Sequence, residues 1–172
     1  MKKTATVYWL LPAKPERELF CTIIRILYKQ FRAPNFEPHL TLFATTKDQS
    51  PKQVLRQISA RPIRLATDGV AFSSKFTKTL FARFKPSPAL RKLVADLSRA
   101  SKSRAKVPND PHASLLYKRI PSQTKKELAA VIRLPFRSVP FDSIAAVRLT
   151  LPVSTGADVE KWKIIAKKSL GR

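Results

Sequence analysis

The chain has 172 residues and a formal net charge of +23, because 34 lysines and arginines face only 11 acidic residues. An apolar fraction of 44% excludes general disorder, and the length suits one domain with a core of its own. The charge excess argues against a cationic substrate and favours nucleic acid or another anionic partner.

The composition also excludes several kinds of site. A single cysteine, Cys21, cannot form an internal disulfide, which favours a reducing compartment. One cysteine and two histidines are too few for a structural zinc site made by the protein alone. Three glycines leave no glycine-rich phosphate loop, and no apolar run approaches the roughly 20 residues that span a bilayer. We therefore expect a cytoplasmic protein with no membrane contact, no metal and no other cofactor.

The first half of the chain predicts an alternation of strands and helices. Residues 6–11 are β-branched, aromatic and apolar, which is typical of a strand. Residues 16–31 carry apolar side chains at helical spacing on one face. A strand is expected at the end of residues 34–43, a short helix after Ser50-Pro51, and strand again over residues 63–73.

The second half repeats this order. We expect a strand over residues 79–84, a helix from Ser87-Pro88, a strand at the end of residues 108–117, a helix capped by Ser122, and strand over residues 144–153. Residues 162–166 fit one more strand, although a helix fits them nearly as well. The sequence therefore predicts a duplicated strand–helix–strand–helix–strand unit, with halves of roughly 1–75 and 76–172. A pseudo-twofold axis would place a site in the crevice between these halves.

Both histidines of the chain lie in the same pattern, Pro-His-x-(Ser/Thr)-Leu. His39 and His112 are 73 residues apart, close to the separation of the first strands of the two halves. Side chains alternate along a strand, so His39 shares a face with Thr41, and His112 shares a face with Ser114. If a twofold axis relates the halves, two imidazoles and two hydroxyls converge.

This set of groups suits the cleavage of a phosphodiester. A neutral imidazole can take a proton from water, and an imidazolium can protonate the departing ribose oxygen, because the unperturbed pKa of histidine is about 6.5. Hydroxyl groups can donate hydrogen bonds to the non-bridging phosphate oxygens. A histidine on a strand is usually structural, but the repetition of the whole pattern favours a functional role. This scheme needs no metal.

The paired motifs resemble those of the 2H phosphoesterase superfamily. F-E-P-H-L-T-L, P-H-A-S-L-L-Y and the early W-L-L-P resemble its cyclic phosphodiesterase group, over about residues 7–170. The resemblance implies an α+β fold with two lobes, each an antiparallel sheet with flanking helices, around a central cleft. It also implies metal-independent opening of a ribose cyclic phosphate. The matching catalytic positions are His39, Thr41, His112 and Ser114.

Three aromatic residues are candidates for contact with the substrate. Tyr117 and Trp9 match positions of that group which contact phosphate or line the pocket, and Phe43 is a further candidate. Strand alternation alone points Tyr117 away from His112, toward the core or the rim of the site. Trp9 and Phe43 fit either a core position or a platform on which a base stacks.

The expected function is hydrolysis of a ribose cyclic phosphate to a phosphomonoester by a monomeric enzyme. The substrate would be a 2′,3′-cyclic nucleotide, an RNA 2′,3′-cyclic end or an ADP-ribose cyclic phosphate. The net charge divides evenly along the chain, +11 over residues 1–86 and +12 over residues 87–172, which favours RNA binding and an RNA end. A non-catalytic RNA-binding module would not need both imidazoles. An RNA-end ligase-like enzyme on the same fold stays open, because the sequence does not separate hydrolysis from its reverse.

Overall fold

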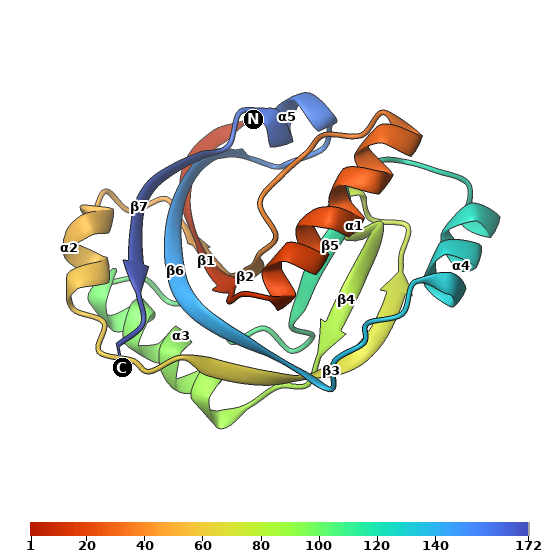
Figure 1. Ribbon diagram of the computed structural model, residues 1–172. Helices are drawn as coiled ribbons and strands as arrows, with labels where there is room; N and C mark the ends of the chain where they lie inside the picture. Colours follow the sequence, from red (N-terminus) through yellow and green to blue (C-terminus); the bar gives the residue numbers. More distant parts are fainter. Residues whose placement is uncertain (172) are drawn as a thin grey trace.

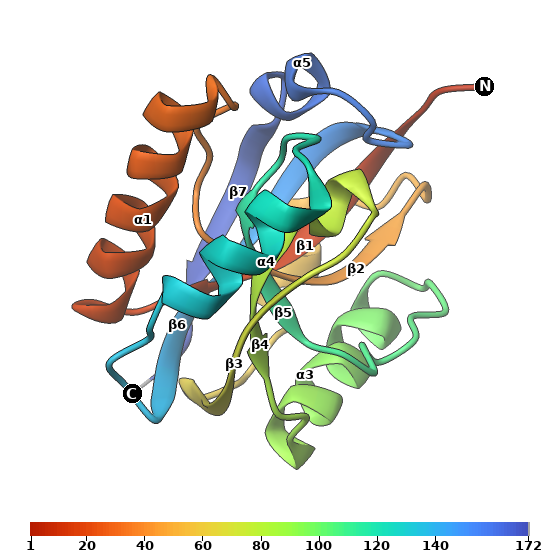
Figure 2. The ribbon, with the colours of Figure 1, turned by 90° about the vertical axis from the view of Figure 1, so that its right-hand side faces the viewer.

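The computed structural model describes residues 1–171, in which a seven-stranded sheet is surrounded by helices (Figures 1 and 2). The strands are β1 (Lys3–Pro12), β2 (Leu40–Thr45), β3 (Ile63–Phe72), β4 (Leu80–Phe84), β5 (His112–Leu116), β6 (Ser138–Leu151) and β7 (Lys163–Ser169). The helices are α1 (Glu16–Phe31), α2 (Pro51–Arg56), α3 (Pro88–Ala100), α4 (Ser122–Val131), α5 (Gly156–Glu160) and the 3-10 turn η1 (Phe76–Lys78).

The predicted order of strands and helices is confirmed. Helix α1 covers the expected residues, and its buried side chains Phe20, Ile24 and Leu27 recur at helical spacing on one face. The expected strand near the C-terminal end is confirmed as β7. The cap of α4 was predicted wrongly: Ser122 is the first helical residue and Pro121 precedes it. Helix α5 and the turn η1 were not predicted, because each is shorter than two helical turns and carries no apolar periodicity.

The sheet joins the two halves of the chain by exchanging strands between them. Its order is β1-β2-β5-β4-β3-β6-β7, and β6 also pairs with β1. Strand β3 of the first half pairs with β4 of the second, while β6 of the second half pairs with β1 of the first. All these pairings are antiparallel, which confirms the α+β class with an antiparallel sheet and flanking helices. The two motif strands, β2 and β5, are neighbours through the pair Leu40 and Ala113.

The motif strands place the apolar neighbours of His39 and His112 in the core. Leu40, Leu42, Ala113 and Leu115 are at most 2% exposed and belong to the hydrophobic core, as the alternation predicts. Helix α1 packs against β5 and β1, α2 against β7, and α4 against β3. Because a fully buried leucine contributes about 1.5–3 kcal/mol, these core contacts hold both strands firmly beneath the site.

A β-bulge interrupts the alternation of β2. Tyr8 pairs with Phe43 and the next residue, Trp9, pairs with Thr41, so Leu42 is an extra residue opposite β1. A bulge of this kind places two residues of one strand opposite one residue of its partner, and therefore changes which face the following side chains occupy.

The second half has the same bulge at the equivalent position. Leu80 pairs with Leu116 and Phe81 pairs with Ser114, so Leu115 is the extra residue opposite β4. The two motif strands therefore share their sequence pattern and also the irregularity that follows it. This repeated bulge decides which aromatic residues reach the site.

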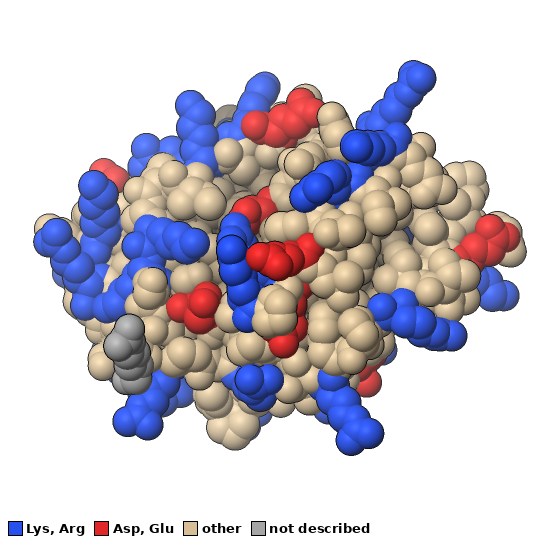
Figure 3. All heavy atoms as spheres, in the orientation of Figure 1, with Lys and Arg blue, Asp and Glu red and all other residues tan. Residues whose placement is uncertain are grey.

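The positive charge is distributed over the surface. Figure 3 shows Lys and Arg side chains around the whole visible face, with few Asp and Glu between them and no single basic stripe. This distribution agrees with the nearly equal net charge of residues 1–86 and residues 87–172. Among residues 1–171, no helix combines the length and the apolar character needed to cross a membrane.

Candidate active site

Both motifs open onto one cavity of about 260 Å³. Its polar wall consists of side chains from the two motifs and from η1, and its apolar wall comes from β1, β6 and the segment that precedes β7. The polar residues are His39, Thr41, Thr77, His112, Ser114 and Tyr117, and the other residues are Val7, Trp9, Ala44, Leu149, Leu151, Val153 and Trp162. The topology thus brings together the two imidazoles that the sequence separates.

His39 lies immediately before β2 and is 3% exposed. Its Nδ1 is 2.6 Å from the backbone carbonyl oxygen of Glu37. A carbonyl only accepts hydrogen bonds, so Nδ1 carries the proton and Nε2 is left with the lone pair. Burial lowers the pKa of His39 to about 4, so the imidazole is neutral at pH 7.

The surroundings of His39 are aromatic. The indole of Trp9 stacks on the imidazole with ring centroids 3.7 Å apart, and the ring of Trp162 stands edge-on at 5.7 Å. The hydroxyl oxygen of Tyr117 lies 3.5 Å from Nε2 of His39. Burial raises the pKa of Tyr117 to about 12, so this hydroxyl keeps its proton and can donate it to Nε2.

His112 is the first residue of β5 and is half-buried. Its Nδ1 is 2.8 Å from the carbonyl oxygen of Asp110, which fixes the same tautomer as in His39. Phe81 stands edge-on to the ring, with centroids 5.2 Å apart. Burial lowers the pKa of His112, and the nearby charge of Lys78 lowers it further, while the bond to Asp110 acts in the opposite direction.

The two motif hydroxyls differ in their availability. Thr41 is exposed on the cavity wall. Ser114 is 4% exposed, and its hydroxyl donates to the backbone carbonyl of Thr77 at 3.0 Å. Both side chains border the same space as the imidazoles, as strand alternation predicts.

Of the three aromatic candidates, two border the cavity. Trp9 does so from β1, and Tyr117 does so because the bulge at Leu115 reverses the alternation that would turn its ring away. The prediction for Phe43 is wrong. The equivalent bulge at Leu42 turns Phe43 into the core, where it is 7% exposed and stacks on Tyr8 at 5.2 Å.

Several residues of the site escaped the sequence analysis. Trp162 and Thr77 line the cavity from segments outside the repeated motifs. Glu37 and Asp110 each stand two residues before a histidine, and their carbonyls hold the Nδ1 atoms. The shared triplet of acid, proline and histidine was a visible signal for the last two. Among residues 1–171, no three histidine, cysteine or carboxylate side chains form a cluster that could hold a metal ion.

Comparison with known proteins gives the family. The model of the cyclic phosphodiesterase-like protein family matches residues 4–170. The cyclic phosphodiesterase of Arabidopsis thaliana is 24% identical over 172 residues, which cover 96% of this chain and 95% of that protein.

Solved structures agree in fold. LigT of E. coli in its apo form superposes with a TM-score of 0.61 at 15% identity over the whole of both chains. LigT complexed with 3′-AMP gives a TM-score of 0.55 at 15% identity, over 98% of this chain and 99% of the other. The chain therefore belongs to the cyclic phosphodiesterase-like family of the 2H phosphoesterase superfamily and is a phosphodiesterase.

Proposed function

We propose that the enzyme hydrolyses a ribose cyclic phosphate to a phosphomonoester, without a metal, by general acid–base catalysis with His39 and His112. One observation carries this proposal. Both imidazoles border a single cavity, and each donates its Nδ1 proton to a backbone carbonyl, so that each Nε2 keeps the lone pair that proton transfer needs. Two such nitrogens are what an in-line displacement at phosphorus requires, one for the nucleophile and one for the leaving group.

The proposed step is an in-line displacement of a ribose oxygen from phosphorus by water. One neutral imidazole takes a proton from water at Nε2 while the water oxygen forms a bond to phosphorus. The bond from phosphorus to one ribose oxygen breaks, and the second imidazole, protonated beforehand, gives its Nε2 proton to that oxygen. The product is a ribose phosphomonoester with a free neighbouring hydroxyl. The hydroxyls of Thr41 and Ser114 would donate to the non-bridging oxygens, where negative charge must be stabilised.

The substrate itself supplies the condition for the acid role. Both imidazoles have pKa values below the ordinary value, so both are largely neutral in the free enzyme at pH 7. An anionic phosphate between them favours the protonated form of a neighbouring imidazole and raises its pKa. Binding of the cyclic phosphate would therefore recruit the proton that the leaving oxygen needs.

The neighbours and the charge support a nucleotide-containing substrate. LigT, which shares the fold, has been crystallised with 3′-AMP. The net charge of +23 would attract any phosphate ester, and it would do most for an RNA end, since each neutralised phosphate adds to the salt dependence of binding. The single cysteine supports a reducing compartment such as the cytoplasm.

A substrate panel tests the proposal. Turnover is measured with 2′,3′-cyclic AMP, an oligonucleotide ending in a 2′,3′-cyclic phosphate and ADP-ribose cyclic phosphate, each with and without EDTA. We expect at least one of them to yield a phosphomonoester at a rate that EDTA leaves unchanged, and phosphorus NMR of the product identifies the oxygen that keeps the phosphate. No turnover of any of the three, or its abolition by EDTA, would contradict the proposal.

A further inference from the structure

One short turn contacts three residues of the second half of the site. The turn η1 (Phe76–Lys78) lies in the connection between β3 and β4, where the two halves of the chain meet. Each of its residues makes a different contact. Together these contacts reach the tyrosine, the serine and the histidine of the second motif.

The first two contacts involve a ring and a carbonyl group. Phe76 is 9% exposed and packs against Tyr117, with ring centroids 6.1 Å apart. The carbonyl of Thr77 accepts the hydrogen bond from the Ser114 hydroxyl. The turn therefore fixes the rotamer of Ser114 and supports the ring of Tyr117 from behind.

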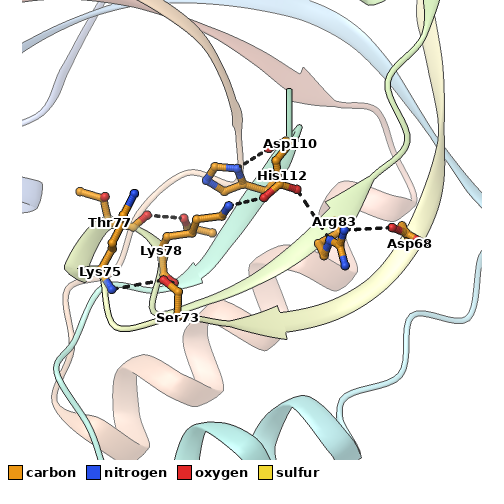
Figure 4. Close-up of polar contacts among 9 residues, drawn as sticks. Asp68, Ser73, Lys75, Thr77, Lys78, Arg83, Asp110 and His112 are labelled. Atoms are coloured by element: carbon orange, nitrogen blue, oxygen red, sulfur yellow. Dashed lines mark hydrogen bonds and ion pairs between the residues drawn. The ribbon is translucent and has the colours of Figure 1, made fainter. Parts of the chain in front are cut away.

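The third contact reaches His112 through Asp110. The ammonium group of Lys78 donates to the carboxylate of Asp110, and the carbonyl of the same Asp110 accepts from Nδ1 of His112 (Figure 4). Lys78 also lies over the face of Phe81, with Nζ 4.6 Å from the ring centroid, and Phe81 stands edge-on to His112. Lys78 thus contacts two neighbours of His112, Asp110 and Phe81, and is not among the residues that line the cavity.

Two other charges complete the chain of ion pairs. Nε of Arg83 is 3.6 Å from the other carboxylate oxygen of Asp110, and Arg83 reaches Asp68 at 3.4 Å. These side chains are 43–45% exposed, so water screens their attraction and each pair contributes little. Lys78 is only 22% exposed and makes a direct charge-assisted hydrogen bond. The hydrogen bond from Lys78 is also the main reason that the pKa of Asp110 is lowered.

We propose that the turn η1 positions the second motif, with Lys78 as a positioning residue that holds His112 through Asp110. The catalytic consequence rests on the function proposed above. The first motif is held differently, because its acidic residue, Glu37, pairs with Arg17 of helix α1. The two histidines share one kind of backbone anchor, but separate parts of the chain hold each anchor in place.

The expected effect of losing Lys78 follows from the tautomer of His112. If Asp110 moves, Nδ1 loses its acceptor, and the proton can shift to Nε2, the nitrogen that faces the substrate. A ring without this anchor can also turn away from the substrate, and a displacement of about 1 Å in a reacting group can cost about 10²-fold in rate. Lys78→Met keeps the length of the side chain and removes its charge.

The experiment compares Lys78→Met with Lys78→Arg and with the control Lys75→Met, which removes an exposed lysine of the same connection. With 2′,3′-cyclic AMP, we expect Lys78→Met to lower kcat about 10- to 100-fold and to change KM little. Lys78→Arg should restore most of the rate, and Lys75→Met should match the wild type. Imidazole nitrogen-15 NMR should show His112 leaving the pure Nδ1–H form in Lys78→Met, while His39 stays in it.

A second variant tests whether Lys78 acts through its ion pair with Asp110. Asp110→Asn keeps the carbonyl and removes the carboxylate, so it should reproduce the loss, and the double variant should be no worse than either single one. An unchanged kcat in Lys78→Met overturns the proposal, and so does a lowered kcat with His112 still wholly in the Nδ1–H form. If the wild type turns over no cyclic phosphate, the proposed function fails, yet the NMR comparison still tests the positioning role.

Discussion

The two histidines have the same backbone anchor in very different surroundings. His39 is buried among aromatic rings. Its imidazole stacks on Trp9, and its Nε2 faces the Tyr117 hydroxyl. His112 is more exposed and lies beside a chain of charged groups that begins with Lys78 and Asp110. The comparison indicates that the hydrogen bond which sets the tautomer is the shared requirement. The environments that set the proton affinity have diverged.

This divergence matters for acid–base chemistry. Two groups that must be in opposite protonation states work best when their surroundings separate their pKa values. Burial lowers the pKa of His39 to about 4 and lowers the pKa of the more exposed His112 less, while a hydrogen bond to a backbone carbonyl opposes the effect at both. Over the intervening pH range one imidazole is neutral while the other retains a proton. Identical sites would not give that range.

The largest effects are expected from removing either imidazole. His39→Ala and His112→Ala should each lower kcat for a cyclic nucleotide by at least about 10²-fold, because each removes one of two proton transfers in a single displacement. The free energy of unfolding should separate the variants. His39→Ala leaves a space beneath Trp9 and should cost about 1–3 kcal/mol, more than His112→Ala at its half-exposed position.

Steady-state kinetics and urea unfolding measure the two quantities on the same samples. The circular dichroism spectrum of each variant serves as the control for folding. If either variant keeps more than a tenth of the wild-type kcat, the two histidines do not act in one step, and the proposed mechanism fails.

An unequal effect, no larger than that of the histidines, is expected from the two hydroxyls. Thr41 is exposed on the cavity wall, whereas the Ser114 hydroxyl already donates to the Thr77 carbonyl. Removing a hydrogen bond to the charged transition state costs about 10²–10³-fold, so Thr41→Val should lower kcat by about that factor. Ser114→Ala should cost only about tenfold, because this hydroxyl must first leave its backbone partner. An equal or reversed order would show that the two half-sites contact phosphate alike.

Many features of the two half-sites could be predicted from the sequence. The repeated Pro-His-x-(Ser/Thr)-Leu pattern predicted the pairing of His39 with Thr41 and of His112 with Ser114, because both depend on the period of a strand and on apolar neighbours that must be buried. The order of strands and helices followed from the alternation of their patterns, whereas the α+β class with antiparallel sheets came from the resemblance to the 2H phosphoesterases. These properties are local, so the sequence expresses them directly.

The remainder depends on contacts between distant segments. The bulges at Leu42 and Leu115 arise from the register against β1 and β4, which no local pattern specifies. They turn Phe43 into the core and bring Tyr117 to the cavity, so one aromatic candidate was placed wrongly and the other only by resemblance. Trp162, between α5 and β7, reaches the site through its edge-on contact with Trp9 of β1, and Lys78 reaches Asp110 across 32 residues of sequence.

The smallest expected effect is that of pH, because a change of pH leaves every side chain of the site in place. Each titrating histidine changes the rate by at most about tenfold per pH unit. Below about pH 4, protonation of His39 leaves no neutral base, so kcat/KM should fall as the pH decreases. As the pH rises through the pKa of His112, which lies below its usual 6.5, the acid is lost and kcat/KM should fall again. The maximum of kcat/KM should therefore lie between pH 4 and 6.5.

Because a bound phosphate raises the pKa of a neighbouring imidazole, the alkaline limb of kcat should lie at higher pH than that of kcat/KM. A maximum of kcat/KM above pH 7 would contradict the separation of the two environments.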